Sequence, residues 1–249
     1  MELEKYMESL IAESVTAHGL LVEMCGEYYV LPQRVLVGLG RVLAELCLAV
    51  RSVDVSEAMA CFDMFDTVNA AIISFARGSL ALGAMAVRRL LEEVTNLVVE
   101  NPSGRPYRDI PRVYEELLRG LVVDHELKET IRALEKLLRS MYGFLSGFTH
   151  PRGEGFMPYL GIWMKPPMVE ANPQSCMNIA RPLLASAASL LLALTPYIVD
   201  RARRNGKEEL LMELKDLLDD LEELPFQEPL DAVRTLEAVV ELLSHVFFG

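Results

Sequence analysis

Residues 182–199 read PLLASAASLLLALTPYIV, a run of 18 residues without a charged side chain. Arg181 precedes the run and Asp200 follows it. A stretch of this length is barely long enough to cross a bilayer, and this one contains two serines and two prolines. We therefore expect a buried core helix here rather than a membrane span, and we expect no membrane as a partner.

The sequence on either side of this run repeats apolar residues every three or four positions, which is typical of amphipathic helices. No alternating pattern long enough for a strand appears. The sequence predicts an all-α fold, a single helical-bundle domain of about seven to nine helices. The expected helical segments are 2–24, 32–51, 56–100, 109–123, 124–150, 174–204, 207–224 and 229–248.

Two of these boundaries are marked by particular residues. Gly26 and the run 28–32 are expected to end the first helix, so that Pro32 lies near the start of the second. Gly78 and Gly83 lie near the middle of 56–100, which is therefore either one kinked helix or two.

The negative charge is unevenly spread, because residues 206–249 are more acidic than residues 1–205. The net charge is −12, which disfavours broad electrostatic attachment to nucleic acid. We expect residues 1–205 to form the helical bundle core, interrupted by an irregular loop at 150–174. Residues 206–249 are expected to form an acidic C-terminal helical hairpin, packed on the core or on a partner subunit. A homo-oligomer, such as a homodimer, is the expected assembly.

The cysteines and the overall composition bear on the cellular compartment. The chain has four cysteines at no CxxC spacing, namely Cys25, Cys47, Cys61 and Cys176. We expect buried, small apolar residues rather than a disulfide framework or a zinc site. The N-terminal residues lack the pattern of a signal peptide, so we expect a cytoplasmic protein. Arginine outnumbers lysine 18 to 6 and amides are few, which fits a thermophile.

Two helical segments carry polar residues spaced four apart, so that each set lies on one helix face. The first set is Arg88, Glu92 and Asn96, and the second is Tyr142, Ser146 and His150. If the two faces meet, these six side chains form a binding pocket. Glycines 143 and 147 are expected to let another helix approach closely. Trp163, in the irregular loop that begins at His150, is expected to cover the pocket.

A structural interpretation of the same residues stays open. Buried polar groups in a helical bundle must satisfy one another. Arg88 and Glu92 would then form an internal ion pair that fixes a helix register. Ser146 would bond the carbonyl one turn back, and His150 would cap its helix.

Motifs for cofactors and metals are incomplete. The stretch 35–40, VLVGLG, lacks the third glycine of a dinucleotide-binding fingerprint. His125 and Glu126 resemble the start of a zinc-protease helix, but a glutamate stands where the second histidine belongs. No Glu-x-x-His pair occurs. We expect no cofactor and no bound metal.

The two polar segments together resemble a group of HEPN-like all-helical prokaryotic families, many of unknown function, which include abortive-infection-type proteins. The matching residues are Arg88, Leu91, Glu92, Tyr142, Leu145, Ser146, Phe148, His150 and Pro151. The resemblance covers about 56–151. It implies a helical bundle that is often dimeric and sometimes a ribonuclease.

Nuclease members of the HEPN group have an arginine, four to six residues, and then a histidine. Arg119 and His125 fit this spacing. The resemblance therefore implies that His125 is a catalytic base and that Arg119 is a cation beside the phosphate. The locally basic stretch formed by Arg105, Arg108 and Arg112 is the expected contact for RNA phosphates.

Three functions remain open. The first is a helical interaction protein with a polar pocket around Arg88, Glu92 and His150, which a dry interior at these residues would favour. The second is a HEPN-like ribonuclease or toxin-type protein, which a basic groove holding Arg119 and His125 would favour. The third is a small-ligand binding protein, which an open cavity with convergent polar groups and no basic rim would favour.

Overall fold

The computed structural model describes residues 15, 18–23, 25–51, 55–77, 79–98, 114, 118–119, 128–149, 173–222 and 231–248. This part of the chain is helical and contains no strand, which confirms the all-α prediction. The helices with defined bounds are α2 (Glu27–Arg51), α3 (Val55–Ala76), α4 (Leu80–Val98), α6 (Lys128–Thr149), α8 (Pro173–Arg204), α9 (Glu208–Glu222) and α10 (Asp231–Phe247).

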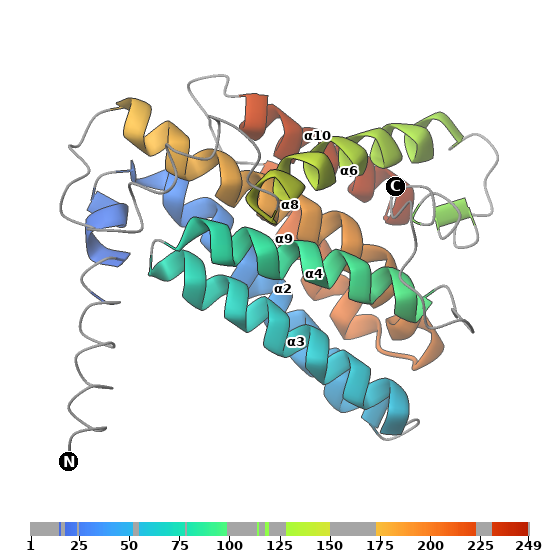
Figure 1. Cartoon of the computed structure of the whole chain (residues 1–249). Coiled ribbons are helices and arrows are strands. Elements are labelled where there is room, and N and C mark those ends of the chain that lie inside the picture. Colours follow the sequence, from blue (N-terminus) through green and yellow to red (C-terminus); the bar gives the residue numbers. More distant parts are fainter. Residues whose placement is uncertain are drawn as a thin grey trace, which may run out of the picture.

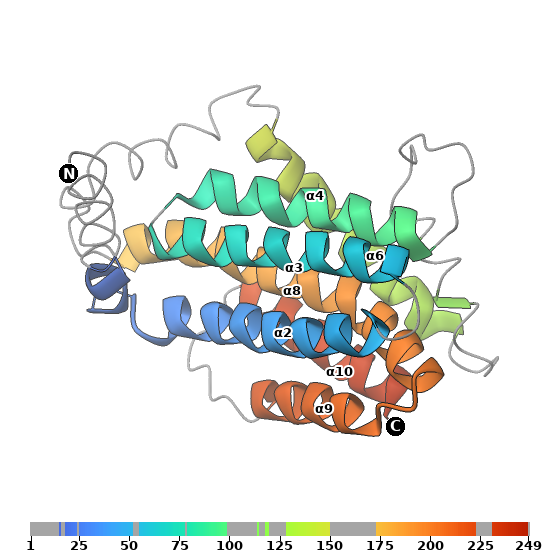
Figure 2. The same ribbon diagram turned by 90° about the horizontal axis from the view of Figure 1, so that it is seen from below.

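Helix α8 runs through the interior of the bundle. Figure 1 shows α3 and α4 in front of it. In Figure 2, which is turned by 90°, α2 and α3 lie in front of it. It packs against α2, α4, α6, α9 and α10. Within 182–199 every side chain except Ala185 is buried. The charge-free run is therefore the core helix that the sequence predicts.

Among the described residues, two helical stretches are long and apolar enough to cross a membrane, judged by length and composition alone. The first is Glu57–Ala76 of α3 and the second is Ala180–Arg204 of α8. The apolar window of the second is 94% buried in the bundle, whereas that of the first is only 33% buried. Helix α3 thus lies in an outer layer, where it packs against α2 and α4.

The segment 56–100 is two helices rather than one kinked helix. Helix α3 ends at Ala76 and α4 begins at Leu80, and between them the Ser79 amide donates to the Ser74 carbonyl at 2.8 Å. Gly83 lies inside α4 and against the buried ring of Phe75 on α3. A Cβ at Gly83 would lie 2.6 Å from Cδ1 of that ring. This glycine therefore allows the two helices to pack closely.

The expected break at 28–32 is wrong, because residues 28–32 lie inside α2. The chain turns at Gly26, which adopts a φ of 51°, and α2 begins at Glu27. Pro32 is the sixth residue of the helix. Pro32 lacks the amide that would bond the carbonyl four residues back, so it costs α2 one intrahelical hydrogen bond near its N-terminal end.

The C-terminal helices pack on the rest of the bundle. Helix α9 contacts α2 and α8, and α10 contacts α8 and α6. The two helices also contact each other. Contact of this acidic pair with a second subunit stays a prediction.

The expectation for the cysteines is half wrong. All four are buried, as expected, but they form two disulfides, Cys25–Cys176 and Cys47–Cys61. The Cα–Cα distances of 5.2 Å and 5.4 Å lie within the usual disulfide range. Sequence spacing could not reveal the first bond, because only the tertiary fold brings the N-terminal end of α2 to the first turn of α8.

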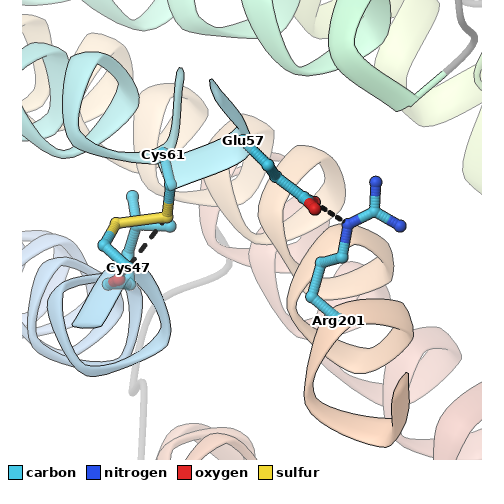
Figure 3. The surroundings of a disulfide bond; sticks show 5 residues. Cys47, Glu57, Cys61 and Arg201 are labelled. Carbon is cyan, nitrogen blue, oxygen red and sulfur yellow. Dashed lines mark hydrogen bonds and ion pairs between the residues drawn. A yellow bond between two sulfur atoms is a disulfide. The ribbon is translucent and has the colours of Figure 1, made fainter. Parts of the chain in front are cut away.

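An ion pair fixes the opposite ends of α3 and α8. Figure 3 shows Glu57 of α3 pointing at Arg201 of α8, close to the Cys47–Cys61 bond. Arg201 Nε donates to Glu57 Oε1, and Arg201 Nη1 donates to Asp200 Oδ2 at 2.5 Å. The guanidinium carbon lies 5.6 Å from the centre of the Tyr197 ring. These partners satisfy a charge that is mostly shielded from water.

Substituting Gly83→Ala is expected to destabilise the protein by about 1–3 kcal/mol, because the new methyl group overlaps the Phe75 ring. The measurement is the free energy of unfolding in denaturant. Gly143→Ala is the matched control, since a Cβ there meets nothing within 4 Å. The control should be neutral or gain up to about 1 kcal/mol from helix propensity. Equal effects at the two sites would contradict the close packing of α3 on α4.

Removing the disulfides is expected to destabilise the protein in proportion to the logarithm of the loop each one closes. Chain-entropy estimates give about 3 kcal/mol for the 14-residue separation of Cys47 and Cys61, and about 5 kcal/mol for the 151-residue separation of Cys25 and Cys176. The measurement is unfolding of the Cys→Ala pair variants beside the oxidised protein. A thiol count of four in the denatured, unreduced protein would contradict the bonds.

Candidate functional site

The two polar helix faces meet where α4 packs against α6. Tyr142 Oη on α6 donates a hydrogen bond of 2.9 Å to Glu92 Oε1 on α4. Arg88 Nε lies 3.4 Å from the same carboxylate oxygen. The Arg88 guanidinium carbon lies 5.4 Å from the centre of the Tyr142 ring, within the range of a cation–π contact. The three residues therefore form one connected polar cluster.

The protonation state of Tyr142 suits its role as a donor. Burial is the main cause that raises the pKa of the Tyr142 phenol, and the Glu92 carboxylate adds to the rise, while Arg88 opposes it. The phenol therefore keeps its proton at neutral pH. A neutral donor bound to a carboxylate makes a charge-assisted hydrogen bond, which is stronger than one between neutral groups.

A second polar cluster joins α3 to α4. Arg89 Nε donates to Glu93 Oε1 at 2.6 Å. The Thr67 hydroxyl of α3 shares its single proton between the Asp63 carbonyl at 3.0 Å and Glu93 Oε2 at 3.3 Å. The Glu93 carboxylate raises the pKa of Arg89, both by accepting this bond and by its charge, and Asp63 contributes a smaller part. Both arginines of α4 are thus held in place by a glutamate one turn away.

An open pocket of about 650 Å³ lies between α3 and α4. Its walls hold three carboxylates, two arginines, one hydroxyl and a small apolar surface. The lining residues are Asp63, Asp66, Thr67, Ala70, Met85, Ala86, Arg88, Arg89 and Glu92. Asp63 and Asp66 of α3 are exposed, and so is Arg89 of α4, so the pocket opens to solvent between the two helices.

Ser146 and the two glycines beside it on α6 do not contribute to the pocket as predicted. Ser146 Oγ donates to the Tyr142 carbonyl at 2.7 Å, one turn back on its own helix, as the structural interpretation expects. Gly143 and Gly147 are exposed and a Cβ on either would meet nothing within 4 Å, so the expected close approach of another helix there is wrong.

Several predicted residues lie outside the described part of the chain. These are His150 and Trp163, and with them the Asn96 side chain, whose backbone lies in the last turn of α4. The predicted ribonuclease residues share this outcome in part. Arg119 is described and exposed, whereas His125 and the arginines at 105, 108 and 112 fall outside the described residues.

The sequence analysis missed the contribution of α3. Asp63, Asp66, Thr67 and Ala70 follow one another at spacings of three, one and three residues, which places them on one face of a helix. The polar members of this face are visible in the sequence, but none of them belongs to a recognised motif.

Among the side chains that the structure describes, no group of three or more histidines, cysteines or acids could hold a metal ion. The absence of a metal and of a cofactor otherwise stays a prediction.

No family model, no curated protein and no solved structure matches this chain. The resemblance to HEPN-like families therefore stays a prediction that rests on the residues quoted above.

The Tyr142–Glu92 bond is expected to show as an energetic coupling. Tyr142→Phe should cost about 1–2 kcal/mol of unfolding free energy in the native background, because a charge-assisted bond is lost. The same change should cost less when Glu92→Gln has already removed the charge. The measurement is a double-mutant cycle by denaturant unfolding.

The matched control cycle combines Lys215→Gln with Asp219→Asn, an exposed pair of 2.5 Å on α9. It should give a coupling below about 0.5 kcal/mol. Additive losses for Tyr142 and Glu92 would show that α4 and α6 do not meet through these side chains.

Proposed function

We propose that this protein binds a small polar molecule in the pocket between α3 and α4. The observation that carries the proposal is the open cavity of about 650 Å³ with the Arg88–Glu92–Tyr142 cluster in and beside its wall. Ligand pockets commonly measure about 300–1,000 Å³ and combine apolar surface with a few fixed polar groups. The pocket has this size and this make-up.

The rim favours ligand binding over the two other candidate functions. A solvent-open cavity with convergent polar groups is unlike the dry interior that a purely structural cluster would have. The α3 rim carries Asp63 and Asp66, so it is acidic rather than basic. Phosphate groups would be repelled there, which disfavours this pocket as an RNA-binding groove.

The charges indicate the class of ligand. Arg88 and Arg89 each pair with a glutamate on their own helix, and Asp63 and Asp66 add two further carboxylates at the α3 rim. The lining thus carries three carboxylates against two guanidinium groups. Ala70, Met85 and Ala86 supply apolar surface beside them. This combination suits a small organic cation with a short hydrocarbon portion.

Binding is expected to be measurable with a simple diamine. In titration calorimetry, 1,4-diaminobutane should bind the wild-type protein, whereas the neutral analogue 1,4-butanediol and inorganic phosphate should not. The variant Asp63→Asn/Asp66→Asn should bind the diamine at least about tenfold more weakly, equivalent to about 1.4 kcal/mol. Glu208→Gln on α9 is the matched control, because it removes an exposed acid far from the pocket, and it should leave binding unchanged.

Binding of phosphate in preference to the diamine would contradict the proposed ligand class. Equal diamine affinity in the wild type and in the double aspartate variant would contradict the site.

The other two functions stay predictions. Ribonuclease activity is tested by incubating the protein with mixed labelled RNAs beside His125→Ala and His150→Ala variants. The predicted homo-oligomer concerns a different surface, formed by α2 and α9.

A further inference from the structure

Helix α2 carries a basic stripe along its outer face. Its exposed residues follow one another at helical spacing, and the stripe consists of Arg34, Val37, Arg41, Leu48 and Arg51. Two of them are large apolar side chains, since Val37 is 55% exposed and Leu48 is 61% exposed. Two acids accompany the three arginines: the exposed Glu27, seven residues before Arg34 on the same face, and Glu45, whose carboxylate lies 3.6 Å from Arg41 Nε. The face therefore keeps a net positive charge.

Helix α9 carries an acidic stripe immediately beside it. Figure 2 shows α2 and α9 side by side on one face of the molecule. The acidic stripe consists of Glu208, Glu209, Met212, Glu213, Asp216 and Asp219. Met212 is 66% exposed. The basic Lys215 on this helix pairs with Asp219 at 2.5 Å.

Within one chain, the charges of the two stripes form few ion pairs with each other. Arg41 Nε lies 3.8 Å from Glu213 Oε2. Arg34 and Arg51 have no ion pair with the described residues. A Cβ on Gly38 would lie 2.8 Å from the Leu217 side chain, so the two helices are already as close as they can pack. The outward charges on both helices are therefore available to a partner.

We propose that this face is a two-fold interface with a second copy of the same chain. A two-fold axis that runs between α2 and α9, in the plane of the face, lays α2 of each copy on α9 of the other. The basic stripe of each copy then meets the acidic stripe of the other. The same contact therefore occurs twice, as an isologous interface requires. Val37, Leu48 and Met212 supply the apolar contact between them.

Charge complementarity selects this partner over others. An anionic surface such as nucleic acid would fit the arginines of α2 but would be repelled by the acids of α9 beside them. A cationic partner would meet the opposite difficulty. A second copy carries both stripes at the same separation, and so matches both at once.

The test uses two charge-reversal variants and their mixture. Arg34→Glu/Arg41→Glu gives both stripes a net negative charge, and Glu208→Arg/Glu209→Arg/Asp216→Arg gives both stripes a net positive charge. All five positions are exposed, so both variants should fold, as circular dichroism would verify. In analytical ultracentrifugation the wild type should sediment as a dimer of the 27.9 kDa chain, whereas each variant alone should dimerise at least about tenfold more weakly.

An equimolar mixture of the two variants should recover the dimer, because each acidic stripe then faces a basic one. Raising the salt from about 0.1 M to about 1 M shortens the screening length from ~10 Å to ~3 Å and should weaken the wild-type dimer. Arg132→Glu, the same charge change on the exposed face of α6, is the matched control and should leave the dimer intact.

A monomeric wild type, a dimer that survives both charge reversals, or a mixture that stays monomeric would each overturn the proposal.

Discussion

The need to bury α8 on all sides is the constraint on which the rest of the structure depends. This helix has no charged residue over 18 positions, so exposing it to water is unfavourable. The cost is about 25 cal/mol for each Å² of apolar surface left uncovered. Covering it takes α2, α4, α6, α9 and α10. Helix α3 is then left in an outer layer. It packs on α2 and α4, and its remaining face forms one wall of the open pocket.

The fold was largely predictable because it follows from periodicity and from a charge-free run, both of which are local signals. The side chains of Arg88 and Glu92 were likewise predictable as one helix face. Their meeting with Tyr142 was not, since it depends on the angle at which α4 crosses α6. The disulfide Cys25–Cys176 was missed for the same reason, because nothing local relates two residues that lie 151 positions apart.

The polar groups of α3 illustrate a different limit. Asp63 and Asp66 lie on one helix face, and the printed sequence is enough to see it. Whether such acids line a cavity or simply face water depends on what packs beside them. Here Gly83 lets α4 pack tightly against α3, so that the arginines of α4 lie across from the aspartates of α3. A close helix contact beneath the pocket thus sets the chemistry of its rim.

The two disulfides bear on the predicted cytoplasmic location. In most cytosols thiols are kept reduced, but intracellular proteins of hyperthermophiles are rich in disulfides. The two disulfides therefore connect two of the predictions made from the sequence. Stable disulfides are expected in a cytoplasmic protein if its source is a hyperthermophile, and are rare in the cytoplasm of other organisms.

The Cys25–Cys176 bond has a mechanical consequence as well. It closes residues 25–176 into a covalent ring, so a force applied to the two ends of the chain cannot draw that segment out. About 500 Å of contour length is withheld from extension. A protease that threads its substrates through a narrow pore would reach Cys25 or Cys176 and then have to pull two strands at once.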